Sequence, residues 1–117
     1  MTGTVELCGM EFFAFHGCLE SERRDGNYFV VDVRFRCDVT DAAESDDLSD
    51  AVNYAEVYDI VAEQMAVPSN LLEHVAARIA SELKGNFTQM LSVSVCVAKR
   101  NPPVKGPVAW SKVTVEL

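Results

Sequence analysis

A lysine stands where the pattern of a β-strand predicts an apolar residue. The odd-numbered residues from Leu91 to Val97 are all apolar, and the next odd position is Lys99. Such a lysine either extends its ammonium past the strand end or is held partly desolvated for proton chemistry. Desolvation favours the neutral amine, the form that takes up a proton. Lys99 is therefore a candidate general acid or base.

Three more residues have a type and a position that suit chemistry. Glu73 follows Asn70 with the spacing of a helix capping box, and its alternative role is to accept parallel N–H bonds from a planar ligand. Tyr54 begins an apolar helical stripe, which predicts a core aromatic whose hydroxyl needs a partner, such as a ligand. Glu22 lies in the polar segment 20–26, where an isolated carboxylate is usually solvated.

Composition limits what these residues can serve. A chain of 117 residues with 49% hydrophobic residues predicts one globular domain, 1–117. Eighteen acidic against ten basic residues give a net charge of −8, which argues against nucleic acid as a partner. No targeting signal precedes Met10, and no apolar run is long enough for a membrane. We expect a cytoplasmic protein without a membrane partner.

The spacing of cysteine and histidine argues against disulfides and bound metal. The four cysteines show no CxxC spacing, and three of them fall in strand-like runs, so we interpret them as reduced packing residues. Two histidines without HxxxH spacing do not predict zinc, and no cofactor is expected. These residues are Cys8, Cys18, Cys37, Cys96, His16 and His74.

Hydrophobic periodicity predicts strands on either side of a helical pair. The segment 28–39 alternates strictly between apolar and mostly charged residues, which is typical of a strand with one dry face. The acidic segment 40–51 predicts a solvated connection with a short helical turn. We expect strands at 4–15, 28–39, 91–99 and 108–117, a helix at 54–65, and a second helix that begins at 72 and stops at Gly85-Asn86.

This order, ββααββ, predicts an α+β fold with an antiparallel four-stranded sheet and both helices on its dry face. The opposite face would carry charged and polar side chains, and two strand edges would remain unpaired. If the edge strands pair with the edge strands of other copies, the sheets close into a ring: no edge stays unpaired, and the polar faces line a solvent-filled interior. We therefore expect a homo-oligomer. The residues expected on the polar face include Asp32, Arg34, Arg36, Lys112, Thr114 and Glu116.

Several short motifs, taken in order, resemble the dihydroneopterin aldolase family. The resemblance covers essentially the whole chain and implies the tunnelling fold. Subunits of that fold close a β-barrel as a tetramer or octamer and bind pterins between neighbours. The motifs are His16-Gly17 with Glu22, Val52-Asn53-Tyr54, Asn70-Leu71-Leu72-Glu73-His74, and Lys99 with Asn101-Pro102-Pro103.

The resemblance implies a reaction in folate biosynthesis. The family splits 7,8-dihydroneopterin into 6-hydroxymethyl-7,8-dihydropterin and glycolaldehyde by a retro-aldol step. The imine of the substrate accepts the released electrons, so neither a metal nor a Schiff base is required. The protein supplies recognition, orientation and proton transfer.

The resemblance also implies a role for individual residues. Glu73, helped by the backbone near Leu72, would hold the amino-pyrimidinone edge of the pterin. Glu22 would approach the hydroxylated tail, and Lys99 would move the proton.

A neighbouring subunit would complete the site. Its Tyr54, with Val52 and Asn53, would cover the ring and contact the reacting end. Asn53 and Cys18 depart from the family pattern, where His and Ala are common, so both departures bear on the tail contacts.

Other functions remain open from the sequence. An enzyme of the same fold could epimerise dihydroneopterin or its triphosphate, although the chain lacks a basic cluster for a triphosphate. A zinc-dependent pterin synthase would need ligands that are missing here. A non-catalytic ring-forming module would use Glu73 as a cap and let Lys99 reach solvent.

Overall fold

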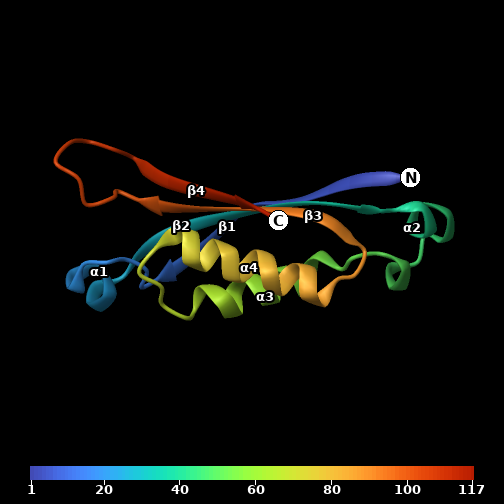
Figure 1. Cartoon of the computed structure of the whole chain (residues 1–117), viewed down its shortest axis with the longest axis horizontal. Coiled ribbons are helices and arrows are strands. Elements are labelled where there is room, and N and C mark those ends of the chain that lie inside the picture. Colours follow the sequence, from blue (N-terminus) through green and yellow to red (C-terminus); the bar gives the residue numbers. More distant parts are fainter.

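The chain is built on one antiparallel sheet. The computed structural model describes residues 1–117. Strands β1 (Thr2–Ala14), β2 (Asn27–Asp38), β3 (Met90–Arg100) and β4 (Trp110–Glu116) lie side by side in that order (Figure 1). Each neighbouring pair is antiparallel. The predicted α+β fold with the order ββααββ is confirmed.

Two longer helices cover one face of the sheet. Helix α3 (Tyr54–Met65) packs on β1, and α4 (Leu72–Asn86) packs on β3 and β4. Three short helices occupy the connections: α1 (Glu20–Asp25), α2 (Thr40–Ser45) and η1 (Leu48–Asp50). The last two confirm a helical turn in the acidic segment, whereas α1 replaces the loop expected around Glu22. None of the helices is long and apolar enough to cross a membrane.

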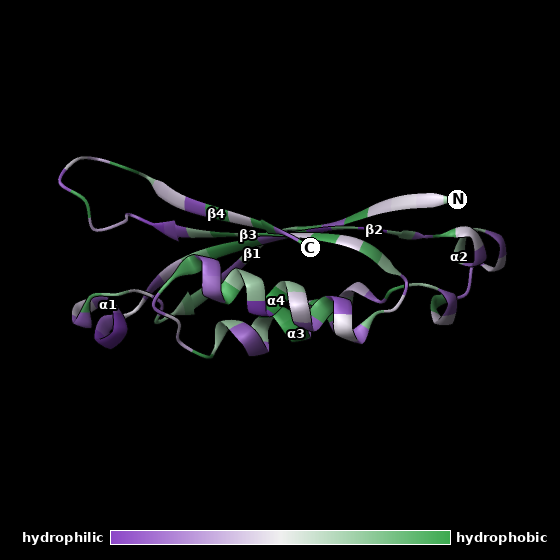
Figure 2. Cartoon of the chain, viewed as in Figure 1, coloured by the Kyte–Doolittle hydropathy of each residue, from purple (hydrophilic) through white to green (hydrophobic).

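The core fills the space between the sheet and these two helices. Alternate residues of β2 face the helices and are buried, as the alternation predicts. The helices contribute residues spaced by three and four positions, so each presents one apolar stripe and a polar outer side (Figure 2). The buried residues are Phe29, Val31, Val33, Phe35 and Cys37 from β2, and Val57, Val61, Met65, Val75, Ile79 and Leu83 from the helices.

A shift of register changes the start of β3. Arg36 pairs with Ser92, but Cys37 pairs with Met90, which leaves Leu91 as an extra residue that is 56% exposed. The prediction that Leu91 begins the buried stripe was wrong, because the bulge turns Met90 inward instead. The stripe of Val93, Val95 and Val97 continues to Lys99, which is only 9% exposed.

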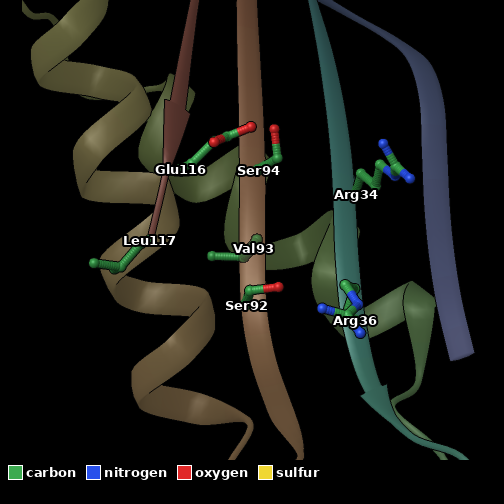
Figure 3. A pocket seen from close by; sticks show the side chains of 7 residues that line it. All are labelled: Arg34, Arg36, Ser92, Val93, Ser94, Glu116 and Leu117. Carbon is green, nitrogen blue, oxygen red and sulfur yellow. The ribbon is translucent and has the colours of Figure 1, made fainter. Parts of the chain in front are cut away.

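The other face of the sheet is polar and open. Arg34 lies on it within 3.4 Å of Glu6. Beside Arg34 is a shallow concavity of about 370 Å³, lined by side chains from β2, β3 and the C-terminal end of the chain (Figure 3). Its lining includes Arg34, Arg36, Ser92, Ser94 and Glu116. Strands β1 and β4 each leave one edge unpaired at the borders of this face.

Candidate active site

The buried lysine predicted at the end of β3 is paired with an acid. Lys99 Nζ lies 2.7 Å from Glu22 Oε2, and the two side chains are only 11% and 13% exposed. A buried charge is costly unless it is paired, and this pair satisfies both groups. The alternatives in which Glu22 is merely solvated and Lys99 merely reaches solvent were therefore wrong. Residues far apart in sequence form one buried ion pair.

The backbone around Glu22 is shaped to hold its carboxylate. Gly17 packs directly on Glu22: a Cβ atom at Gly17 would lie 2.5 Å from Cδ of the acid. No other residue fits there without displacing the carboxylate. The second oxygen, Oε1, lies 3.4 Å from the backbone nitrogen of Leu19 at the start of α1. The turn after β1 therefore fixes the direction in which Glu22 meets Lys99.

His16 stands beside this pair as a neutral residue. It is 1% exposed, and its ring forms a T-shaped contact with that of Phe29, the β2 partner of Lys99. Its Nδ1 accepts a hydrogen bond of 3.0 Å from the backbone N–H of Ser69, so Nε2 carries the ring proton. Burial, followed by the charges of Arg78 and Lys99, lowers the pKa of His16 to about 4. The sequence suggested a motif at His16-Gly17 but no role for either residue, because the role lies in contacts with residues distant in sequence.

The capping box predicted for Asn70 and Glu73 is not formed. The N-cap position of α4 is occupied by Leu71, whose side chain makes no capping hydrogen bond. The Oδ1 atom of Asn70 accepts a hydrogen bond from Arg23 of α1 instead. Glu73 is exposed and makes no hydrogen bond or ion pair within the chain. Its carboxylate is therefore available to a ligand.

The first turn of α4 also offers unpaired donors next to Glu73. The backbone N–H groups of Leu72 and Glu73 have no partner in the chain, as is usual at an uncapped helix start. Leu72 itself is 8% exposed and anchors the helix in the core. An acceptor carboxylate beside unpaired donors matches the edge of a planar amide-containing heterocycle.

The interpretation of Tyr54 as a core aromatic was wrong. Its side chain is 65% exposed, because α3 buries Val57, Val61 and Met65 and leaves both Tyr54 and Tyr58 on its flank. Tyr54 lines an open, mostly apolar hollow with residues of β1. The hollow also contains Leu7, Cys8, Met10, Ala55, Tyr58 and Asp59.

The two residues before Tyr54 have clear structural roles. Asn53 is the N-cap of α3, and its Oδ1 accepts a 2.9 Å hydrogen bond from the N–H of Ala55. Val52 is half-buried and packs against the core. Both residues fix the place where Tyr54 starts its helix.

The three elements that carry the ion pair of Lys99 with Glu22 and the Glu73 side chain meet at one end of the molecule. Figure 1 shows α1, the start of α4 and the end of β3 there. The N–H of Gly17 donates to the carbonyl of Ser69 at 3.0 Å, and Cys18 Sγ lies 3.4 Å from the carbonyl of Asn70. These contacts fasten the turn before α1 to the segment that leads into α4.

Comparison with known proteins fits this geometry. The family model for dihydroneopterin aldolase (FolB) matches residues 5–116. The chain belongs to the dihydroneopterin aldolase family. The dihydroneopterin aldolase of Staphylococcus epidermidis is 39% identical over 107 residues, which cover 91% of this chain and 88% of the relative. That of Bacillus subtilis is 34% identical over 114 residues, which cover 97% and 93%.

Solved structures of dihydroneopterin aldolases share the fold. The E. coli enzyme, solved in complex with neopterin, has a TM-score of 0.89 at 23% identity, covering 98% of each chain. A Vibrio cholerae structure described as a putative dihydroneopterin aldolase has a TM-score of 0.88 at 24% identity, covering 98% of this chain and 96% of the other. At such identities the likeness shows the fold.

Family membership gives the reaction. Dihydroneopterin aldolase is an aldehyde-lyase of folate biosynthesis that cleaves 7,8-dihydroneopterin by a retro-aldol step, and this is the activity of the chain. The substrate is a small pterin. The prediction from the motifs is confirmed, and a non-catalytic binding module is excluded.

Proposed function

We propose that the retro-aldol cleavage takes place between two subunits of a ring, with Lys99 as the residue that moves the proton. The 2.7 Å pair of Lys99 and Glu22, buried in one chain and placed beside the start of α4, carries this proposal. Residues 1–117 act as one domain in the cytoplasm, and the mechanism uses neither a metal nor a Schiff base.

The retro-aldol step needs proton transfer, which is the role proposed for the pair of Lys99 and Glu22. The hydroxyl on the carbon that becomes the aldehyde loses its proton, the adjacent carbon–carbon bond breaks, and its electrons move into the pterin imine. The carbon that stays on the ring then takes up a proton, so one proton is removed and one is returned. Lys99 takes this proton as the neutral amine and returns it to the carbon as the ammonium, which Glu22 orients while it also meets the hydroxylated tail. Both residues are fixed before the substrate arrives.

The start of α4 supplies recognition. The Glu73 carboxylate accepts from the amino and ring N–H groups of the pterin, while the backbone N–H of Leu72 donates to the ring carbonyl. Solved relatives hold neopterin in one case and guanine in another, and both compounds present an amino-pyrimidinone edge. That shared edge supports the assignment of Glu73 and Leu72.

Tyr54 of the same chain lies too far away to take part. It begins α3, whereas α4 follows the opposite end of that helix, roughly 17 Å away at 1.5 Å per residue. Tyr54 also lies against β1, and Lys99 lies on β3, two strands away in the sheet. The tyrosine that covers the pterin must therefore come from another subunit, along with its Val52 and Asn53.

The free edges of the sheet support one placement of that subunit. In a ring, the β1 edge of one copy pairs with the β4 edge of the next and continues the antiparallel order. Since α3 packs on β1 and α4 packs on β3 and β4, this pairing brings Tyr54 of one copy towards Glu73 of the next. A tetramer or an octamer of two rings satisfies the geometry.

Mixing two inactive variants tests the shared site. Lys99→Met and Tyr54→Ala each remove one contribution, so each alone should be inactive. Refolding them together at equal amounts should restore about a quarter of the sites, because a random ring pairs an intact Lys99 with an intact Tyr54 at that frequency. If the mixed rings refold but are no more active than either variant alone, one chain supplies both residues.

Product analysis tests the chemistry. Purified protein incubated with 7,8-dihydroneopterin should release glycolaldehyde and 6-hydroxymethyl-7,8-dihydropterin in equal amounts. A product that keeps the intact side chain would show epimerisation instead.

A further inference from the structure

Ser69 joins segments that lie far apart in the sequence. Its N–H donates to His16 Nδ1 at 3.0 Å, and its carbonyl accepts from Gly17 N at 3.0 Å. Its hydroxyl lies 2.8 Å from His74 Nδ1 and 2.9 Å from Arg78 Nη2. The residue is 5% exposed. Every polar group of Ser69 therefore has a hydrogen-bond partner: the backbone contacts the turn after β1, and the hydroxyl contacts α4.

The backbone of Ser69 leads to the proton-transfer pair. It fixes His16 and Gly17, and Gly17 packs on the carboxylate of Glu22. Glu22 in turn holds Lys99. A movement of Ser69 therefore changes the position of the acid that orients the ammonium.

The side chain of Ser69 leads to the pterin anchor. His74 directly follows Glu73 in the first turn of α4. Arg78, one turn further on, also donates to the carbonyls of Gln64 and Val67, which fixes the end of α3 against α4. The hydroxyl of Ser69 thereby ties the loop between these helices to the turn that carries Glu73.

The direction of these hydrogen bonds is determined by the donor groups. A guanidinium has only donors, so the Ser69 oxygen accepts from Arg78. The Ser69 proton is then available to His74 Nδ1, which accepts it in the neutral imidazole. Alanine at position 69 would break both bonds and leave the backbone contacts to His16 and Gly17 possible.

We propose that Ser69 is a positioning residue that sets the pterin anchor at Glu73 relative to the proton-transfer pair of Glu22 and Lys99. This proposal rests on the proposed function above. Both ends must meet the same substrate molecule, and a misplacement of about 1 Å lowers the rate by about a hundredfold. Each end would stay intact without the Ser69 hydroxyl, but their separation would no longer be fixed.

The test compares Ser69→Ala with Ser45→Ala in the intact oligomer. Ser45 also makes two hydroxyl contacts, with Asp50 at 2.6 Å and Asp47 N at 3.1 Å, but it lies in the acidic connection away from the site. Turnover should be measured per neopterin-binding site, and neopterin affinity by fluorescence. We expect Ser69→Ala to lose about tenfold or more in kcat with neopterin affinity changed less than about twofold, and Ser45→Ala to change neither.

Two outcomes would overturn the proposal. One is unchanged kcat per site in Ser69→Ala. The other is a fall of kcat matched by an equal fall in neopterin affinity, which is expected if the hydroxyl supports only the pterin anchor. Because burial makes Ser69→Ala prone to unfolding, His74→Ala is the second variant: His74 is exposed, and its removal breaks the same link. It should show the same selective loss of kcat.

The Lys99→Met variant in the same assay separates this proposal from the proposed function. Normal turnover of Lys99→Met would mean that the site itself is wrong. Lost turnover in Lys99→Met with normal kcat in both Ser69→Ala and His74→Ala would refute only the positioning role.

Discussion

The two halves of the proposed site differ in how completely a single chain builds them. Lys99 and Glu22 are buried, paired and supported by the turn at Gly17, so the proposed proton-transfer half is complete within one chain. Glu73 has no partner, and Tyr54 is 65% exposed on the flank of its helix. The proposed recognition half is thus open to a ligand and to a neighbouring subunit.

The physical cost of charge explains the difference. A charge removed from water must be paired, so the proton pair has to be complete before the substrate binds. A carboxylate that recognises a ligand has the opposite need, because internal bonds would compete with the ligand for the same oxygens. The predictions below separate the two halves, starting with the largest expected effect.

Replacing Lys99 should stop the chemistry without preventing pterin binding. Lys99→Met should lower turnover by about a hundredfold or more, since it removes the group that exchanges the proton. It should also destabilise the fold by about 3 kcal/mol, because Glu22 is left buried and unpaired. Steady-state kinetics and thermal unfolding measure the two effects.

The double variant Lys99→Met/Glu22→Gln is the control for Lys99. It should regain most of the lost stability, because no unpaired charge remains, and stay inactive. An active double variant would contradict the role of the pair.

Blocking the β4 edge should dismantle the recognition half. Leu117 exchanges both backbone bonds with Val93, so by antiparallel alternation the N–H of Thr114 points away from β3. Thr114→Pro therefore keeps the bonds to β3 but clashes with a neighbouring strand. We expect smaller species by analytical ultracentrifugation and at least a tenfold loss of activity.

Thr114→Val is the matched control, since it keeps the backbone N–H. It should assemble and cleave normally. An intact ring formed by Thr114→Pro would rule out pairing through β4.

Glu73→Gln should weaken pterin binding and leave stability unchanged. Loss of charge-assisted hydrogen bonds costs roughly 2 kcal/mol, which is about thirtyfold in affinity. The side chain is exposed and makes no hydrogen bond or ion pair within the chain that the substitution would break. Neopterin fluorescence titration and the melting temperature measure the two quantities, and a lowered melting temperature with normal affinity would point back to a capping role.

Acid should destabilise the proton-transfer half through His16. Its pKa is about 4 in the folded chain and 6.5 when unperturbed, so the unfolded chain binds a proton first as the pH falls. The contribution is fully present above pH 6.5 and is lost as the pH falls to about 4, by about 3 kcal/mol. Denaturant unfolding at each pH should show this slope.

His16→Asn should flatten the unfolding profile between pH 6.5 and pH 5, whatever its effect on stability at neutral pH. Equal slopes in the two proteins would show that the pH dependence comes from other groups.

Much of the fold could be predicted from the sequence. The alternation along β2 and the helical stripes of α3 and α4 gave the antiparallel sheet and the face that the helices cover. Two features were not visible: the bulge that excludes Leu91 and the short helix that carries Glu22. Both depend on contacts between strands and connections, which leave no period in the sequence.

The sequence by itself determined which groups are available for chemistry, because a lysine in an apolar stripe and a glutamate near a helix start are visible as departures from a pattern. Only the tertiary structure decided what each group does. In the folded chain Lys99 pairs with Glu22. Asn70 accepts a hydrogen bond from Arg23, and Glu73 has no partner within the chain. The side chain of Tyr54 points to solvent. Such outcomes depend on competition between partners distant in the sequence, and only the folded chain brings those partners together.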